Sequence, residues 1–453
     1  MGKTCYDVQN GQHPLSDPLK KKKGAAIMTK DNLKYGAYCN ILREELVPAM
    51  GCTEPIALAY CAAKARQTLG EMPDKVIIGA SGSIIKNVKS VIVPNTDHMK
   101  GIPAAAAAGI VAGDPEKELE VIASVTREQI SQMRAFLENT PIVVAHVDNG
   151  LTFDIIVTVF KGEHYAKVRI VNYHTNIVLI EKDGQTLMEV EVDGEDESGL
   201  TDRSVLNLKD ILDFAETVDV EDIRETIGRQ IRYNSAIAAE GLRGNYGSNI
   251  GSILLEMYGD SSVMIRAKAM AAAGSDARMN GCEMPVIINS GSGNQGMTTS
   301  LPVIEYAREL QVSEEKLYRA LVLSNLVAIH QKTSIGRLSA FCGAVSAGAG
   351  AGAGIAYLQG ADLEGISHTV ANALATTGGI VCDGAKASCA SKIASSVEAG
   401  ILGYNMHLRG MDFQPEDGLV GQTPEETIAN IGRLGKQGMK ATNEEIIKIM
   451  VGE

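Results

Sequence analysis

The chain changes character near an acidic stretch at 193–202, and this change constrains its fold more than any other feature. Before this stretch, runs rich in β-branched and apolar residues are typical of strands. Beyond it, long segments carry apolar residues at helical spacing, and only 285–289 resembles a strand. A chain of 453 residues is too long for one hydrophobic core. We therefore predict an α+β domain at 28–200, followed by a mostly helical domain at 205–453.

The N-terminal domain is predicted to contain an antiparallel sheet. The runs typical of strands are 75–80, 90–94, 141–147, 153–160, 165–173, 176–181 and 186–192. Consecutive runs are separated by Asn149-Gly150, Lys161-Gly162 and Asp183-Gly184, and such pairs are typical of β-hairpin turns. Helices are predicted at 31–70, with an interruption at 48–55, and near 104–112 and 127–138.

Composition restricts the partners and the compartment. A net charge of −13, with 20–23 as the one strongly basic run, disfavours nucleic acid and anionic membranes. Residues 338–361 carry no charge, but they are mostly Ala, Gly and Ser, so we expect a buried helix rather than a membrane span. Residues 1–27 lack the apolar core of a secretory signal and are predicted to be a disordered extension or an upstream start. We expect a cytoplasmic protein with reduced thiols, in which clustered cysteines indicate metal binding or catalysis. Assembly into a homo-oligomer is left open.

Cys342, Cys382 and Cys389 lie in glycine-rich, nearly uncharged sequence that suits a metal centre. Glycine lets backbone amides approach a bulky inorganic group and donate hydrogen bonds to its sulfurs. On an unbroken helix Cys382 and Cys389 would stand about 10 Å apart. Gly384 instead predicts a loop, with a helix that opens at Cys389 and turns its positive end to an anionic cluster. No Cys-x2-Cys pair is present, so spacing alone leaves a metal site and a structural role both open.

Cys52 lies at a turn, within MGCTEP, before a helix that is expected to begin near Pro55. The positive end of that helix would lower the pKa of its thiol, and a thiolate serves as base, nucleophile or metal ligand. The alternative is a cysteine that merely fills the turn. Cys39 and Cys61, on apolar helical faces, are predicted to be structural. Cys282 is also predicted to be structural, with a functional role left open.

A loop at 290–296 is a candidate site for a small anion. Gly291, Gly293 and Gly296 form a Gly-x-Gly-x-x-Gly pattern there, but no βαβ unit surrounds it, so a dinucleotide site is not expected. Donors at the start of a helix suit a carboxylate, and a structural turn is the alternative. A second polar loop, at 95–98, includes a histidine that is expected to be solvated.

Four segments together resemble the L-cysteine desulfidase family, which is related to the iron–sulfur L-serine dehydratases. They are MGCTEP, INSGSGNQGMTTSLPV, SAFCGAV and GGIVCDGAKASC, at 50–55, 288–303, 339–345 and 378–389. The resemblance covers nearly the whole chain from Met28. It implies a [4Fe–4S] cluster on Cys342, Cys382 and Cys389, no pyridoxal phosphate, and Cys52 as catalytic base or fourth ligand. With three protein ligands, one iron stays open as a Lewis acid.

The resemblance also implies a bound amino-acid substrate. Its binding residues are predicted to be Thr53, Ser290, Gly293, Asn294 and Gln295. The dehydratases carry a Ser-Ser-His-Thr turn where this chain has MGCTEP, and the missing histidine favours cysteine over serine as the substrate. We therefore expect β-elimination of L-cysteine to sulfide, ammonia and pyruvate. The alternatives are an L-serine dehydratase or another β-eliminating lyase, and a cysteine-binding protein without activity.

Overall fold

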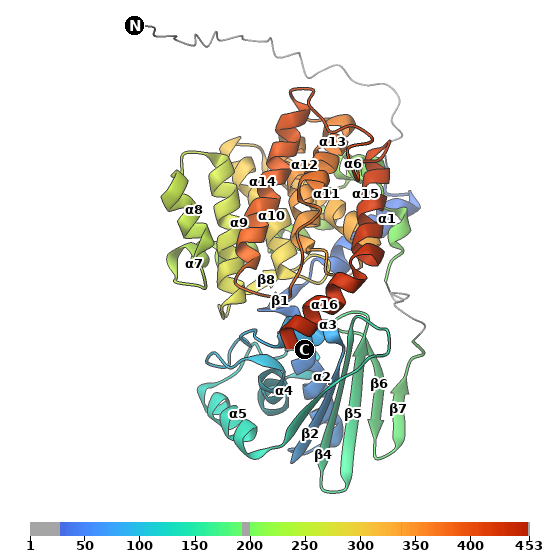
Figure 1. Cartoon of the computed structure of the whole chain (residues 1–453), viewed down its shortest axis with the longest axis vertical. Helices are drawn as coiled ribbons and strands as arrows, with labels where there is room; N and C mark the ends of the chain where they lie inside the picture. Colours follow the sequence, from blue (N-terminus) through green and yellow to red (C-terminus); the bar gives the residue numbers. More distant parts are fainter. Residues whose placement is uncertain (1–27, 193–199, 337, 452–453) are drawn as a thin grey trace.

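The computed structural model describes residues 28–192, 200–336 and 338–451. They form two lobes, one built around a six-stranded sheet and the other almost entirely helical (Figure 1). The predicted α+β class is therefore confirmed. The predicted extension at 1–27 and most of the acidic stretch lie outside the described residues.

The sheet is mixed rather than purely antiparallel. Its strands are β2 (Lys75–Ala80), β3 (Ile142–His146), β4 (Asp154–Lys161), β5 (His164–Val171), β6 (Ile177–Lys182) and β7 (Gln185–Glu189). Their order is β3-β2-β4-β5-β6-β7, and only β2 and β3 run parallel. Because β2 lies between β3 and β4, the Asn149-Gly150 pair is not a hairpin turn. The run predicted as a strand at 90–94 forms only an isolated bridge, between Ile92 and Lys100.

The hairpin that joins β6 and β7 follows the sequence prediction closely. Lys182 pairs with Gln185, and the two residues between them, Asp183 and Gly184, have φ values of 49° and 81°. Two successive positive φ values define a type I′ turn, whose twist matches that of the strands.

Small residues bring the helices of this lobe close to one another and to the sheet. The helices are α2 (Thr53–Leu69), α3 (Gly82–Val88), α4 (Gly101–Ala112) and α5 (Arg127–Asn139). On α2, the Cys61 thiol donates to the backbone oxygen of Val168 in β5 at 3.4 Å, which places α2 against the sheet. A Cβ atom at Gly109 of α4 would lie 2.0 Å from the Ala59 oxygen, so α4 packs directly on α2.

The helical lobe surrounds α12, a buried helix made mostly of Ala and Gly. Its helices are α1 (Leu33–Glu45), α6 (Leu208–Thr217), α7 (Val220–Arg243), α8 (Ile250–Tyr258), α9 (Val263–Met279), α10 (Gly293–Glu309), α11 (Glu314–Ile335), α12 (Gly343–Leu358), α13 (Leu363–Thr377), α14 (Cys389–His407), α15 (Pro424–Arg433) and α16 (Lys440–Val451). Most of α12 is buried, as predicted. In the described part of the chain, no helix is long and apolar enough to cross a membrane.

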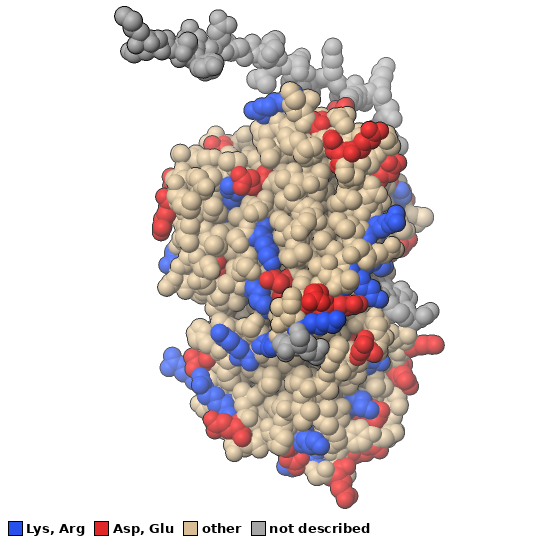
Figure 2. All heavy atoms as spheres, in the orientation of Figure 1, with Lys and Arg blue, Asp and Glu red and all other residues tan. Residues whose placement is uncertain are grey.

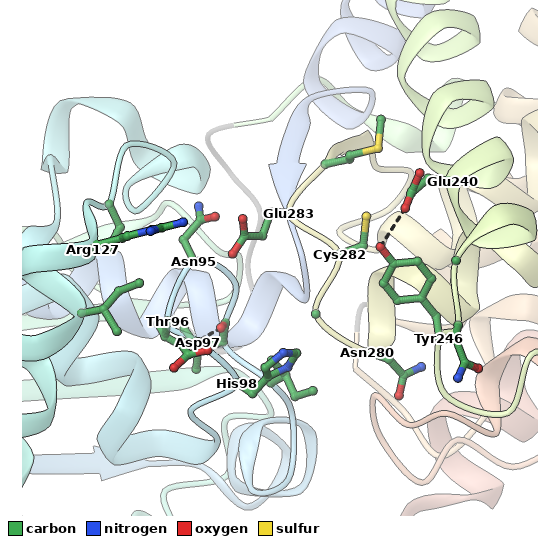
Figure 3. A pocket seen from close by; sticks show the side chains of 18 of the residues that line it. Asn95, Thr96, Asp97, His98, Arg127, Glu240, Tyr246, Asn280, Cys282 and Glu283 are labelled. Carbon is green, nitrogen blue, oxygen red and sulfur yellow. Dashed lines mark hydrogen bonds between the residues drawn. The ribbon is translucent and has the colours of Figure 1, made fainter.

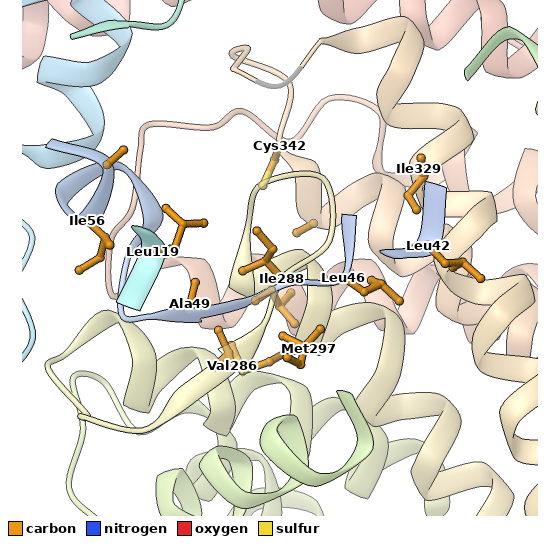
Figure 4. Close-up of a cluster of buried hydrophobic side chains, with 14 of the residues drawn as sticks. Leu42, Leu46, Ala49, Ile56, Leu119, Val286, Ile288, Met297, Ile329 and Cys342 are labelled. Carbon is orange, nitrogen blue, oxygen red and sulfur yellow. The ribbon is translucent and has the colours of Figure 1, made fainter. Parts of the chain in front are cut away.

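The two lobes are joined by chain segments from both ends. Helix α1 packs in the helical lobe, where the rings of Tyr38 and Phe214 lie 5.1 Å apart. Strand β1 (Pro48–Met50) pairs with β8 (Pro285–Ile287), and the apolar cluster around them includes Ala49, Ile56 and Val286 (Figure 4). At the C-terminal end, α16 reaches α3 between the lobes (Figure 1). The division into domains at 28–200 and 205–453 stays a prediction.

Charged side chains are interspersed over the visible face of both lobes (Figure 2). Basic and acidic residues are scattered among uncharged ones there, and neither kind forms a large continuous patch on this face. That nucleic acid is not a partner remains a prediction from the net charge.

Candidate active site

One cavity of about 90 Å³ brings together residues from both lobes. Its lining includes Cys52, Cys342, Cys382 and Cys389, the four cysteines that the sequence singles out as functional. The other polar lining residues include Glu54, Lys86, Asn87, Arg278, Ser292, Asn294, Gln295, Lys332 and Ser339. Segments far apart in the sequence therefore meet at one polar, cysteine-rich site.

Two helix starts and a short bridge position the three candidate ligands. Cys342 is the N-cap of α12, and Cys389 is the first residue of α14, as predicted. The Cys342 amide donates to the Ile380 oxygen at 3.1 Å, and the Cys382 amide donates to the Ala340 oxygen at 2.6 Å. These bonds hold Cys342 beside Cys382, and the positive ends of two helices lie at the site.

The three thiols fit a group that carries positive charge. Burial, followed by the charge of Cys382, raises the pKa of Cys342 to about 12, and burial also raises the pKa of Cys389. Three thiolates at this place need positive counter-charge, which the iron ions of a [4Fe–4S] cluster provide. Among the described residues, no three His, Cys, Asp or Glu side chains converge on a single metal ion. The fit to a cluster therefore rests on the shared cavity and the helix ends.

Cys52 lies where the sequence predicts, but its pKa is shifted in the opposite direction. It is the N-cap of α2 and only 2% exposed. Its Sγ donates to Oε2 of Glu54 at 3.1 Å. Burial and the Glu54 carboxylate raise the pKa of Cys52 well above its ordinary value, despite the opposing charge of Arg278. The prediction of a lowered pKa is wrong because the cost of burying a thiolate exceeds the effect of the helix end.

Glu54 is a hydrogen-bond acceptor beside Cys52 that the sequence analysis missed. Burial opposes its ionisation, but the charge of His174 and the hydrogen bond from Cys52 outweigh burial and lower the pKa of Glu54. Its other oxygen, Oε1, accepts from Asn87 Nδ2 at 2.9 Å. The available signal was an acidic residue in the first turn of a helix, two positions after the candidate base.

Arg278 was also missed, and it connects the two candidate segments. This residue of α9 donates from Nε to the Gly51 oxygen at 2.8 Å and from Nη1 to Asn294 Oδ1 at 3.1 Å. A Cβ atom at Gly293 would lie 2.4 Å from Arg278 Nε, so glycine makes room for the guanidinium. In the sequence, an arginine within an alanine-rich helix was the only signal.

The predicted substrate residues divide into two groups. Asn294 and Gln295 line the cavity. The Thr53 hydroxyl donates to the Gly291 oxygen at 2.8 Å, and the Ser290 hydroxyl donates to Asn289 Oδ1 at 2.9 Å. Thr53, Ser290 and Gly293 thus shape the adjoining backbone, and direct contact with substrate stays a prediction for all five residues.

Packing accounts for the last glycine of the Gly-x-Gly-x-x-Gly pattern. A Cβ atom at Gly296 would lie 2.0 Å from the Ile287 oxygen, so α10 can approach β8 only with glycine there. This close approach requires no dinucleotide.

A second, larger cleft of about 1100 Å³ opens elsewhere between the lobes (Figure 3). The polar loop at 95–98 forms one wall, and Tyr246, Cys282 and Glu283 lie across from it. Burial raises the pKa of Cys282, and the Tyr246 hydroxyl donates to Glu240 Oε1 at 3.0 Å. None of the four candidate functional cysteines lines this cleft.

Comparison with known proteins identifies the family. The model of the serine dehydratase alpha chain matches residues 116–448. A UPF0597 protein of Desulfitobacterium hafniense is 59% identical over 426 residues, which cover 94% of this chain and 99% of that protein. The chain belongs to the UPF0597 family and carries a serine dehydratase alpha-chain domain.

Other UPF0597 proteins are similar over nearly their full length. One from Lachnoclostridium phytofermentans is 54% identical over 417 residues, covering 92% of this chain and 100% of that protein. One from Aeromonas hydrophila is 40% identical over 419 residues, covering 91% and 95%. Arg278 and the three candidate ligands fall within the serine dehydratase alpha-chain match, whereas Cys52 precedes it.

Proposed function

We propose that this UPF0597 protein is an iron–sulfur L-cysteine desulfidase that releases sulfide, ammonia and pyruvate. The observation that carries this proposal is that Cys52, Cys342, Cys382 and Cys389 line one and the same cavity. The serine dehydratase alpha-chain domain supports a lyase that acts on a β-substituted amino acid.

Cys342, Cys382 and Cys389 would hold the [4Fe–4S] cluster. When bound, such a cluster supplies an open iron that acts as a Lewis acid toward the β-substituent of the substrate. Cys52, as its thiolate, accepts the proton from the substrate α-carbon, and Oε2 of Glu54, 3.1 Å from Sγ, accepts a hydrogen bond from the thiol that results. The electrons of the Cα–H bond form the Cα–Cβ double bond while the Cβ–S bond breaks and sulfide leaves. The aminoacrylate product takes up water and yields pyruvate and ammonia.

An L-serine dehydratase is the second candidate, because the matching domain model is that of the serine dehydratase alpha chain. The same cavity and proton acceptor would serve elimination of water. Pyruvate release from L-cysteine and L-serine, measured side by side, separates the two activities by their kcat/KM values. We expect cysteine to be preferred.

The test is anaerobic reconstitution with iron and sulfide, followed by iron, acid-labile sulfide and product analysis. We expect a brown protein that releases sulfide and pyruvate from L-cysteine in equal amounts. Cys382→Ser should lose most of the iron and the activity. Cys52→Ala should keep the iron while kcat falls about 10²- to 10⁴-fold, the usual contribution of a general base.

The matched control is Cys39→Ala, since Cys39 is buried in α1 and does not line the cavity. It should keep both iron and turnover. The proposal fails if Cys382→Ser binds iron and turns over L-cysteine as well as the parent protein does.

A further inference from the structure

Three buried polar atoms of residues at the cavity have no hydrogen-bond partner among the described residues. They are Nη2 of Arg278, Oδ1 of Asn87 and Oε1 of Gln295. All three residues line the cavity, and they are only 4%, 6% and 5% exposed. Arg278 and Asn87 come from opposite lobes and offer a donor and an acceptor. A buried polar group left unpaired costs roughly 1–3 kcal/mol, so native proteins rarely retain one without a reason.

Arg278 is fixed in place and still has a free donor. Its Nε and Nη1 atoms are bound to the Gly51 oxygen and to Asn294 Oδ1. These bonds hold the planar guanidinium and leave Nη2 unpaired. A guanidinium donor is a strong partner for a carboxylate, because both groups are charged.

Asn87 presents the complementary group from the other lobe. Its Nδ2 donates to Glu54 Oε1 at 2.9 Å, and an ionised carboxylate only accepts, so the orientation of the amide is determined. The unpaired Oδ1 is therefore an acceptor. A Cβ atom at Gly384, where φ is +94°, would lie 2.9 Å from this oxygen, and the glycine keeps the approach open.

We propose that Arg278 Nη2 binds the carboxylate, and Asn87 Oδ1 the ammonium group, of a free α-amino acid. The two contacts do not require the elimination reaction. The inference rests on the proposed function only for what happens to the β-substituent of the bound amino acid. It changes the role of Asn294, which positions Arg278 through the bond to Nη1. Peptides and N-acylated amino acids are then poor ligands, because each amide bond replaces a charged ammonium or carboxylate group by a neutral one.

Two fragments of cysteine test the two contacts separately. The probes are 3-mercaptopropionate, which lacks the amino group, and cysteamine, which lacks the carboxylate. Their binding to the anaerobically reconstituted protein is measured by calorimetry and as inhibition of turnover. Arg278→Met should lower the affinity for 3-mercaptopropionate about 10- to 100-fold, which is the usual effect of losing a charged hydrogen bond. The affinity for cysteamine should stay nearly unchanged. Asn87→Leu should do the reverse, and both variants should raise the KM for L-cysteine.

Arg266→Met is the matched control, since Arg266 lies on the same helix and binds Glu309 at 2.5 Å outside the cavity. It should change neither affinity. If Arg278→Met does not fold, Arg278→Lys takes its place as the test variant and keeps the positive charge. The affinity for 3-mercaptopropionate should then fall less in Arg278→Lys than the affinity for cysteamine falls in Asn87→Leu. Both changes are measured against the parent protein.

The inference is overturned if one variant loses affinity for both fragments equally, or if neither variant loses affinity for its fragment. This outcome is separate from failure of the proposed function. If the variants distinguish the two fragments but no sulfide is released, the two contacts are supported and the elimination reaction is refuted. If sulfide is released but the variants do not distinguish the fragments, the reaction is supported and the two contacts are refuted.

Discussion

At the scale of single residues, burial and neighbouring charge decide which side chain holds a proton. The Cys52 thiol is protonated because burial and Glu54 raise its pKa, while the pKa of Glu54 is lowered despite its burial. The two side chains therefore act as a pair, in which the proton stays on the Cys52 thiol and is donated in a hydrogen bond to the Glu54 carboxylate.

Glu54→Gln should remove the carboxylate charge beside Cys52 and keep the shape of the side chain. Because that charge raises the pKa of Cys52, the pKa of the thiol should fall in the variant. Activity should therefore appear at a less alkaline pH than in the parent protein. We expect kcat for L-cysteine to fall by about 10-fold, because a less basic thiolate takes the α-proton more slowly, with the iron content unchanged. A kcat profile measured against pH checks this expectation, and an unchanged profile would refute the role of Glu54.

Asp276 gives a prediction for stability. Burial raises the pKa of its carboxyl from 3.8 to about 6, and its Oδ1 has no partner in the described structure. Because the folded state binds the proton more tightly, this group destabilises the protein progressively as pH rises from about 4 to 6, by at most about 3 kcal/mol above that range. Asp276→Asn should raise Tm at pH 8 and much less at pH 4. Equal Tm gains at both pH values would contradict the cause.

At the scale of elements, glycine sets the distance between the two helices that start at the candidate cluster ligands. A Cβ atom at Gly400 of α14 would lie 2.3 Å from the Gly348 oxygen of α12. These helices begin at the Cys342 cap and at Cys389, so their close crossing helps to set the separation of the two sulfurs.

Gly400→Ala should force α12 and α14 apart. Overpacking of this kind costs typically about 1–3 kcal/mol, and we expect a lower Tm together with fewer iron atoms retained per chain. Gly36→Ala on α1 is the control, because a Cβ atom there meets nothing within 4 Å. It should raise the free energy of unfolding by roughly 0.5–1 kcal/mol through better helix propensity. Equal effects of the two substitutions would rule out the packing argument.

At the scale of the whole molecule, the cavity exists only where the lobes meet. Asn87 comes from α3 and Arg278 from α9, and Lys86 beside Asn87 donates to Asn443 Oδ1 of α16 at 2.7 Å. The last helix of the chain thus stabilises one wall of the site in the N-terminal lobe.

Asn443→Leu should leave the buried Lys86 ammonium without this acceptor. We expect the free energy of unfolding to fall by about 1–3 kcal/mol and the reconstituted protein to lose iron faster in air. Chemical denaturation and timed iron analysis measure the two effects. Lys436→Leu, at a position outside the cavity lining, is the comparison and should leave iron retention as in the parent protein. If both variants lose iron at the same rate, α16 does not stabilise the site in this way.

Local sequence patterns determined much of the secondary structure of this protein. Strand alternation, with the Lys161-Gly162 and Asp183-Gly184 pairs, predicted most of the sheet and two hairpins, and glycine with cysteine predicted a helix that begins at Cys389. Such features depend on residues near in sequence, so they can be predicted without the fold. The family resemblance then added the grouping of the four cysteines.

Tertiary structure decided what depends on distant neighbours. Strand β3 joins β2 in parallel because of the crossover between them, which alternation alone does not encode. The raised pKa of Cys52 follows from its burial between the lobes, since a helix start by itself predicts the opposite shift. Arg278 and Asn87 became candidates only when each was seen with one bonded atom and one unpaired atom at the same cavity. Burial and partner geometry arise from the whole chain, which is why neither could be predicted from a local pattern.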